Sequence, residues 1–269
     1  MPEINASERD TYYYHKSVNK TKSQCTHHYH NSFEIYYLKS GNCNYFIDNR
    51  LYEIKVGDIV LIPSGVIHKT NYDETEPHSR MLINCSEGFV PSSVIPVLPS
   101  MIYLYRNPEI TEEADLIFAK IDAEYERDDA FRIEALRCLT FELFFLLARN
   151  AKKCEIVSAG SLFIEETVKH IQKNYMNEIN LSDMAKRHSV SPEHLSRTFK
   201  KETGFGFAEF LTLVRLQKAE YMLKNEPGKT VCEVAYACGF NDSNYFSDKF
   251  KRAYGQAPSK FKKKIAPKA

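Results

Sequence analysis

The strongest constraint on the fold is an internal repeat in the last third of this 269-residue chain. The segment Leu195–Lys200 (LSRTFK) recurs 51 residues later as Phe246–Lys251 (FSDKFK), and a glycine follows each copy at the same distance, Gly204 and Gly255. In both copies the apolar residues stand four apart, which is the spacing of one face of an α-helix. The chain therefore contains two related helical units.

A second pair of matched segments lies upstream and completes each unit. Asp183–Ala185 recurs as Glu233–Ala235 with an offset of 50 residues, so the second copy has one extra residue between its two matches. A turn between helices tolerates such an insertion. Each copy therefore predicts a helix, a tight turn and a second helix. We place these at residues 181–188, 189–191 and 192–202, and at 231–238, 239–241 and 242–254.

Each predicted second helix has a defined start and one apolar face. Ser191 before Pro192 supplies an N-cap followed by proline at the first helical position, and Asp242 can cap the second copy. The apolar pairs face the core, so the polar side chains between them face outward. Such helices fit the major groove of DNA, where arginine pairs with guanine and asparagine with adenine. The residues predicted to meet bases are Glu193, Ser196, Arg197, Ser243, Asn244, Ser247 and Asp248, and those predicted to meet phosphates are Lys200, Lys201 and Lys251.

Charge is unevenly distributed along the chain. The net charge is +1, but residues 161–269 hold 19 Lys and Arg against 12 Asp and Glu and so carry +7, which leaves −6 for residues 1–160. A basic segment joined to an acidic one is expected when only one of them meets a polyanion. A solvated basic face gives the same count. The charge thus agrees with double-stranded DNA as the partner of the C-terminal segment without requiring it.

The first part of the chain has the pattern of an all-β domain. From about Thr11 to Asn84, apolar and polar residues alternate, with many β-branched and aromatic residues. Turn sequences such as Ser40-Gly41-Asn42 interrupt this pattern at short intervals. Short strands at this spacing predict a sandwich or a barrel.

Two helices are predicted after the β region. From Thr111 apolar residues recur at helical spacing, and Asp128-Asp129 marks a turn between two helices, which form an αα-hairpin. Packing on the barrel and homodimer formation through the wide apolar stripe of the second helix both fit this pattern. The predicted organisation is an N-terminal arm and barrel at 1–108, the helical hairpin at 109–150, a linker at 151–160 and the DNA-binding domain at 161–269.

Composition narrows the cellular setting. The N-terminus has no apolar segment of the signal-peptide type, and the longest apolar stretch, residues 139–148, is interrupted by Glu142 and is too short to span a bilayer. The seven cysteines are scattered and form no Cys-x-x-Cys pair, which suits a reducing compartment. We therefore expect a cytoplasmic protein with no membrane partner.

The C-terminal segment, over residues 164–265, resembles the DNA-binding region of the AraC/XylS family of transcription regulators. The segments that carry this resemblance are 179–185, 191–204 and 239–247. It implies a long central helix, here about residues 206–225, that places two recognition helices in successive major-groove segments. It also implies RNA polymerase as a partner if the protein activates transcription. Asp248 stands where the family often has arginine or a neutral residue, so we expect the first unit to supply more of the base specificity.

The N-terminal segment resembles the cupin barrel family at both of that family's motifs. His28, His30 and Glu34 match the first motif and His68 matches the second, but Tyr72 stands where the family has asparagine. Residues two apart in a strand share one face, so His28 and His30 can both face the barrel interior. Three imidazoles and a carboxylate would suit Zn, Mn, Fe or Ni.

Three interpretations of this cluster stay open: a pocket for an organic ligand, which we favour, a divalent-metal site, and a purely structural hydrogen-bond cluster. Nearby aromatic residues fit stacking on the apolar face of a sugar and fit core packing equally well. No role is predicted for His15 or His78, which are isolated in the sequence. The residues predicted to line the ligand pocket are His28, His30, Glu34, Tyr36 and His68, and a metal would use His28, His30, Glu34 and His68.

Two functions of different classes follow from these patterns. The favoured one is a homodimeric transcription regulator, in which a small molecule such as a sugar binds the barrel and shifts the DNA-binding halves through a coupling of about 1–3 kcal/mol. The rival is a metal-dependent cupin enzyme with a fused helical module. No Walker loop, dinucleotide fingerprint or Ser-His-Asp set predicts another enzyme class. We therefore predict no enzyme activity and a two-domain fold, with an all-β cupin-like barrel and αα-hairpin followed by an all-α domain of two helix-turn-helix units joined by a long helix.

Overall fold

The chain forms two compact units. One comprises Met1–Ile47 and Tyr52–Ser158, and the other includes Ala159–Ala269. The structure is a computed structural model that describes residues 4–5, 11–21, 32–48, 50–72, 76–100, 104–151 and 160–265.

Two β-sheets form the core of the N-terminal unit. Their strands are β1 (Ile4–Asn5), β2 (Thr11–Lys20), β3 (Phe33–Ser40), β4 (Cys43–Ile47), β5 (Arg50–Ile54), β6 (Ile59–Ile62), β7 (His68–Tyr72), β8 (His78–Cys85) and β9 (Leu104–Tyr105). The larger sheet has the order β1-β2-β8-β3-β6-β9, and the smaller sheet has the order β5-β4-β7. Two 3-10 helices, η1 (Glu87–Phe89) and η2 (Ile95–Ser100), lie between β8 and β9.

Strand β3 illustrates how the sequence builds both faces of the larger sheet. Tyr36 and Leu38 belong to an apolar cluster shared with the smaller sheet, whereas Ile35 and Tyr37 belong to a cluster shared with the helices. Both faces of this strand are therefore covered, and its first six residues are all buried. Glu34 lies on the inner face, with its carboxylate near a histidine of β7.

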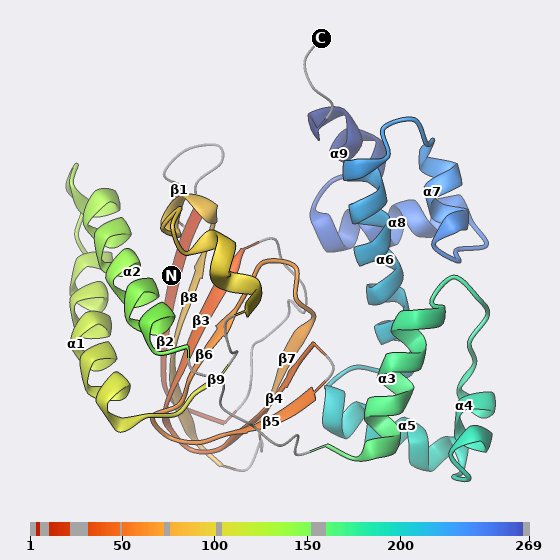
Figure 1. Ribbon diagram of the computed structural model, residues 1–269, viewed down its shortest axis with the longest axis horizontal. Helices are drawn as coiled ribbons and strands as arrows, with labels where there is room; N and C mark the ends of the chain where they lie inside the picture. The colour runs from red at the N-terminus through yellow and green to blue at the C-terminus, as the bar shows by residue number, and fades with distance from the viewer. Residues whose placement is uncertain are drawn as a thin grey trace. The chain divides into compact units, whose positions relative to one another are not determined.

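A pair of helices covers the outer face of the larger sheet (Figure 1). They are α1 (Pro108–Tyr125) and α2 (Arg132–Arg149), and they confirm the predicted αα-hairpin. Helix α1 begins after Asn107, whose side chain accepts a hydrogen bond from the Glu109 amide at 3.0 Å. The Thr140 hydroxyl of α2 donates to the Tyr12 hydroxyl of β2 at 3.2 Å, which ties the hairpin to the sheet.

The C-terminal unit is all-helical over residues 160–265. Its helices are α3 (Leu162–Asn174), α4 (Leu181–Arg187), α5 (Pro192–Thr203), α6 (Phe207–Asn225), α7 (Val231–Ala237), α8 (Ser243–Tyr254) and α9 (Pro258–Ile265). The long helix α6 runs from the group formed by α3, α4 and α5 to the group formed by α7, α8 and α9 (Figure 1). The fold class predicted from the sequence is confirmed, and each predicted boundary of these repeated helices differs from the structure by no more than one residue. None of the helices in the described ranges is long and apolar enough to cross a membrane.

Candidate DNA-binding surface and effector pocket

The caps of α5 and α8 fix where the two second helices begin and end. The Ser191 hydroxyl accepts a hydrogen bond from the His194 amide at 3.1 Å, and the Asp242 carboxylate accepts from the Asn244 amide at 2.6 Å. Both helices end at a glycine in the left-handed conformation, Gly204 with φ 77° and Gly255 with φ 71°. These four positions are matched in the repeat, so the two helices have equivalent ends.

One apolar face of each of these helices is fully buried. Leu195 and Phe199 of α5 are buried, as are Phe246 and Phe250 of α8. Phe199 contacts Phe210 of α6 with ring centroids 5.6 Å apart. Both helices are thus held against the long helix with the opposite face turned to solvent.

All ten residues predicted to meet DNA lie outside these buried faces. Ser196, Ser243 and Ser247 are half-buried at the edges of the helices, and the other seven are exposed. The structure therefore leaves them available to a duplex, and their contacts with DNA stay a prediction. The exposed seven are Glu193, Arg197, Lys200, Lys201, Asn244, Asp248 and Lys251.

Two carboxylates on this surface have local partners. Asp248 forms an ion pair with Arg252, one turn further along α8, at 3.0 Å. This pairing offsets the negative charge that departs from the family pattern. A backbone hydrogen bond at the start of α5 and the Ser191 hydroxyl lower the pKa of Glu193, so its carboxylate is ionised at neutral pH.

Tyr245 is a candidate DNA contact that the sequence analysis missed. It lies in the first turn of α8 beside Asn244 and is 50% exposed, and the Lys249 ammonium stands 5.2 Å from its ring centroid. An exposed aromatic ring there can contact a thymine methyl group or a phosphate. In the sequence only polar side chains are predicted to face outward on this helix, so Tyr245, directly before the core residue Phe246, is not among the predicted contacts.

The turn of the second helix-turn-helix packs closely against the end of α3. Gly239 has φ +83°, and a Cβ atom there would lie 2.8 Å from the carbonyl oxygens of Tyr175 and Met176. The Arg215 guanidinium of α6 donates to the Tyr175 carbonyl at 2.7 Å and to the Asn177 carbonyl at 2.8 Å. The segment after α3 therefore joins the two helix-turn-helix units into one body.

Glu34 and His68 meet inside the barrel, as the cupin resemblance implies. The His68 Nε2 atom is 3.6 Å from a Glu34 carboxylate oxygen, and both side chains are buried. The Tyr45 hydroxyl donates to Glu34, while the Nδ1 atom of His68 lies 2.7 Å from the Val66 carbonyl and so donates to it. This bond leaves Nε2 directed toward Glu34.

The remaining two residues of the predicted cluster, His28 and His30, lie outside the described residues. Among the residues that are described, no group of three or more His, Cys, Asp or Glu is arranged to hold a metal ion. A metal at this place would therefore need His28 and His30 in addition to Glu34 and His68.

Tyr36 and Tyr72 form the next polar layer of the barrel interior. Their hydroxyl groups are 2.9 Å apart, and Arg80 donates to the Tyr72 hydroxyl at 3.3 Å. Burial raises the pKa of both phenols, which are therefore neutral hydrogen-bonding groups. The tyrosine that replaces the asparagine of the cupin motif thus links Tyr36 to a buried guanidinium.

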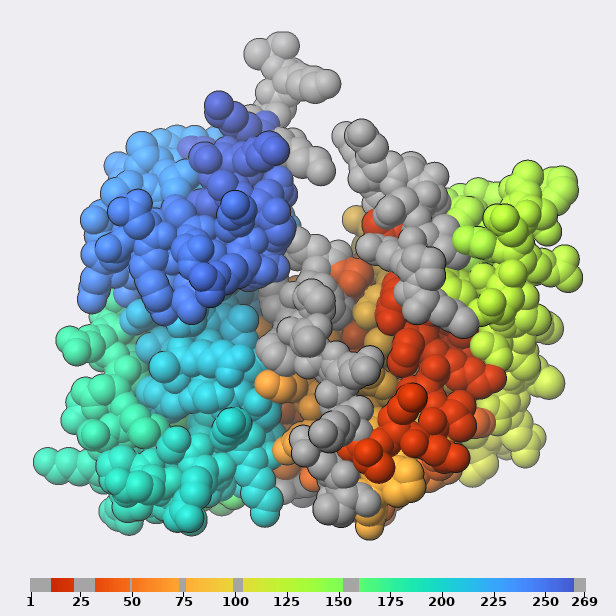
Figure 2. Space-filling model, turned by 180° about the vertical axis from the view of Figure 1, so that it is seen from behind, coloured from red at the N-terminus to blue at the C-terminus, as the bar shows by residue number. Residues whose placement is uncertain are grey.

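A pocket of about 250 Å³ lies at the end of the barrel where β2 ends and β8 begins. It contains both histidines for which the sequence predicted no role, and burial followed by the charge of Arg80 lowers the pKa of each. In the space-filling view, β2 forms an open part of the surface of this unit beside the helical hairpin (Figure 2). The described residues that line the pocket are His15, Ser17, Asn19, Lys20, Thr21, His78 and Arg80.

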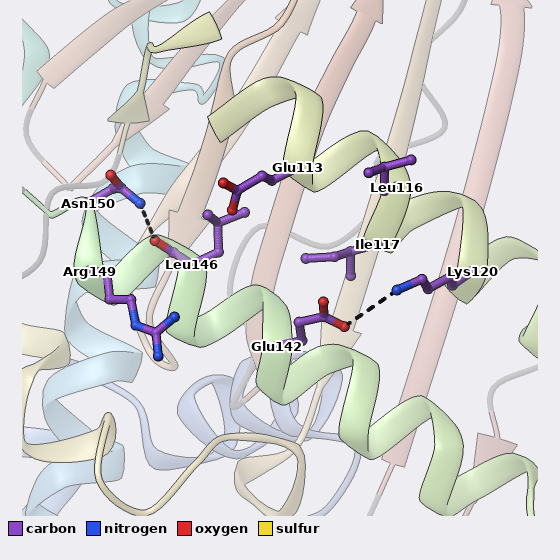
Figure 3. Close-up of a pocket in the computed structure, with 8 residues that line it drawn as sticks. All are labelled: Glu113, Leu116, Ile117, Lys120, Glu142, Leu146, Arg149 and Asn150. Atoms are coloured by element: carbon purple, nitrogen blue, oxygen red, sulfur yellow. Dashed lines mark hydrogen bonds and ion pairs between the residues drawn. The ribbon is translucent and has the colours of Figure 1, made fainter. Parts of the chain in front are cut away.

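A second hollow, of about 450 Å³, lies between α1 and α2 (Figure 3). Lys120 of α1 and Glu142 of α2 face each other across it at 4.0 Å, and Asn150 donates to the Leu146 carbonyl at 2.8 Å. Leu116, on the same surface, is 67% exposed. This surface is thus a mixture of apolar and charged side chains on the helical hairpin.

Two family profiles match this chain. The profile described as an AraC-like ligand binding domain matches residues 12–140, and the profile described as a helix-turn-helix domain matches residues 184–264. The chain is similar to the HTH-type transcriptional activator RhaR of Mannheimia succiniciproducens, with 23% identity over 248 residues that cover 90% of this chain and 88% of that protein. It is also similar to the Msm operon regulatory protein of Streptococcus mutans, with 25% identity over 242 residues, 87% of this chain and 85% of that protein.

Among solved structures, the C-terminal domain of the response regulator AraT from Geobacillus stearothermophilus is 31% identical, with a TM-score of 0.38. The match covers 40% of this chain and 88% of that one.

A ligand-binding barrel followed by a double helix-turn-helix domain defines a DNA-binding transcription regulator that responds to an effector. The chain belongs to the AraC/XylS family of such regulators. Its curated relatives are named as regulators and match it over most of their length, so the chain is not a cupin enzyme.

Proposed function

We propose that this regulator reads DNA mainly through α5 and adds a second, weaker reading through α8. Two observations support this division: Arg197 is exposed on α5, whereas the corresponding Asp248 of α8 is an acid already paired with Arg252. In the proposed complex Arg197 pairs with guanine and Asn244 with adenine, while Lys200, Lys201 and Lys251 neutralise phosphates. The remaining predicted contacts are Glu193, Ser196, Ser243 and Ser247.

The proposed effector is a sugar bound in the barrel interior. Glu34 and His68 are buried, polar and adjacent there, and Tyr36 lies in the next layer of the same interior. Buried polar groups with a few aromatic neighbours are typical of sites for small hydroxylated ligands. His28 and His30 complete the proposed lining. A metal on the histidines and Glu34 is the second candidate for this place.

The proposed active form is a homodimer joined through α1 and α2. Leu116 on α1 is 67% exposed, and Phe145 on α2 is also exposed. Large apolar side chains on the outer surface of a helical pair favour association with a second copy. We propose domain boundaries near residues 108, 150 and 160, so that this hairpin is a dimerisation segment between the barrel and the DNA-binding domain.

The proposed outcome of DNA binding is activation through RNA polymerase. RhaR of Mannheimia succiniciproducens is named as a transcriptional activator and matches this chain along most of its length. In this proposal effector binding sets the geometry of the two recognition helices on DNA, and the bound regulator then contacts RNA polymerase.

The observation that carries the proposal is the repeated, equivalently capped pair α5 and α8 with one buried and one polar face. The test is selection of bound duplexes from a random-sequence DNA pool by the full chain. We expect enrichment of two short conserved blocks about one helical turn apart, since each helix enters one major-groove segment. No enrichment at low salt would contradict the proposal.

A further inference from the structure

The pocket at the end of β2 is built from polar and basic groups. Of its described lining residues, Lys20 and Arg80 are cations, and none is an aspartate or a glutamate. Its volume of about 250 Å³ lies below the range of about 300–1,000 Å³ typical of sites for drug-sized ligands. The pocket therefore suits a small, polar ligand better than an apolar one.

Arg80 is held in a defined position at the base of this pocket. Its side chain is only 7% exposed, it donates to the Tyr72 hydroxyl at 3.3 Å, and its guanidinium lies 5.6 Å from the Tyr72 ring centroid. A planar guanidinium that is already oriented matches the two oxygens of a carboxylate. This arrangement would spare a bound anion part of the entropic cost of ordering the side chain.

Two other polar side chains of the pocket are buried, and each has a hydrogen-bonding atom that is unsatisfied within the described residues. The Ser17 side chain is 5% exposed and His78 is 2% exposed, and among the described residues neither the Ser17 hydroxyl nor the His78 Nδ1 atom has a hydrogen-bond partner. Buried polar atoms normally have partners, because an unsatisfied one costs free energy. Ser17 is directly opposite Arg80, and Lys20 is directly opposite His78, in the pairing of β2 with β8.

The two imidazoles of this pocket supply hydrogen bonds rather than charge. Burial and the nearby guanidinium lower the pKa of both His15 and His78, so each ring is neutral at neutral pH. A neutral imidazole has one donor and one acceptor, which suits a hydroxyl group of a ligand. The cations Arg80 and Lys20 then remain to bind an anionic group.

We propose that the effector is a small hydroxylated carboxylic acid of the sugar-acid class, whose carboxylate binds Arg80 and Lys20 and whose hydroxyl groups bind Ser17, His15 and His78. This inference rests on the proposed function, in which the barrel holds the effector, and it assigns the anionic end of that ligand to the β2–β8 end of the barrel. Glu34 and His68 belong to the opposite end of β3 and β7 and do not line this pocket.

The test is a thermal-shift titration of the full chain with D-galacturonate, D-glucuronate and D-gluconate. Each acid is paired with its neutral counterpart, D-galactose, D-glucose or D-glucitol, and D-glucose 6-phosphate serves as a second kind of anion. We expect a saturable rise in the unfolding midpoint with at least one acid, and at least about tenfold weaker binding of its neutral partner.

Two variants locate the binding. Arg80→Gln should weaken the acid by about 10- to 100-fold, since charge-assisted hydrogen bonds are the strong ones. Lys20→Gln, at an exposed position, should fold normally and weaken the acid several-fold. Neither should change the binding of a neutral sugar.

Several results would overturn the inference: binding of a neutral sugar as tight as that of its acid, binding of the phosphate ester alone, binding of none of the acids, or an unchanged affinity of the acid for Lys20→Gln. DNA binding measured on the same samples distinguishes a failure of the sugar-acid inference from a failure of the proposed function. If the chain selects a DNA sequence but binds no acid, only the sugar-acid inference fails. If it selects no DNA sequence, the proposed function fails whatever the ligand result.

Discussion

Replacing Arg197 with alanine separates base reading from general DNA binding at the first recognition helix. Arg197 is exposed on α5, and its guanidinium makes no hydrogen bond or ion pair with the described residues. The substitution should therefore change the free energy of unfolding by about 0.5 kcal/mol or less. A bidentate contact between arginine and guanine is worth about 1–3 kcal/mol of discrimination, which corresponds to roughly 5- to 150-fold in affinity.

The matched control is Lys200→Ala, at another exposed position of the same helix. A lysine that neutralises a phosphate contributes equally on every sequence, so this variant should bind cognate and random duplexes equally less well. The slope of log affinity against log salt concentration should also fall by about 1. Arg197→Ala should instead lose affinity for the cognate duplex and relax the preference at one base position.

The assay is fluorescence anisotropy with a selected duplex and a scrambled duplex at several salt concentrations. Equal losses on both duplexes for Arg197→Ala would refute its assignment as a base-reading residue. Selective loss on the cognate duplex for Lys200→Ala would refute the phosphate assignment. Thermal unfolding of both variants checks that the C-terminal unit is intact.

Three further predictions concern stability and assembly. Gly239→Ala should lower the unfolding midpoint of the C-terminal unit more than Gly255→Ala. Both positions have positive φ, which costs an alanine about 1–2 kcal/mol, but only at Gly239 would the added Cβ lie against backbone oxygens. Equal midpoints for the two variants would contradict this. Leu116→Glu should convert a dimer into a monomer in size-exclusion chromatography with light scattering, and an unchanged mass would exclude α1 from the interface. The pKa values of His15 and His78 are lowered in the folded protein, so the unfolded chain binds more protons, and stability that is present above about pH 6.5 should be lost as the pH falls. His78→Gln should reduce this loss. An unfolding midpoint that rises as the pH is lowered from 7.5 to 5.5 would contradict the reasoning.

The helical domain was the most predictable part of the chain because its signals are local. Capping residues such as Ser191 and Asp242 act on amides two or three positions away, and the apolar pairs are set by the helical period. The repeat then supplied a second, independent copy of every signal. The close approach of Gly239 to the end of α3 could not be foreseen, since it depends on how α3 packs beside the second unit.

The β-barrel was predictable as a class but not in its interior. Alternation indicates strands, yet it does not say which strands pair or in which register. The cupin resemblance correctly brought Glu34 and His68 together. It gave no reason to connect Tyr72 with Tyr36, because the hydrogen bond between them uses a tyrosine where the motif has asparagine. The neighbours of a substituted motif residue are decided by packing and not by the motif.

The basic pocket depends on the register of β2 and β8, which shifts between Ser17 and Lys20. Ser17 and Arg80 are directly opposite in this pairing, and side chains on a strand alternate between its two faces. Lys16, one residue earlier, therefore points the other way and pairs with Asp122 of α1 at 2.6 Å. A shift of one residue in this pairing would move the charge of Lys16 into the barrel and remove the Ser17 hydroxyl from it. The register thus determines both how the hairpin is attached to the sheet and which polar groups a ligand in the barrel can meet.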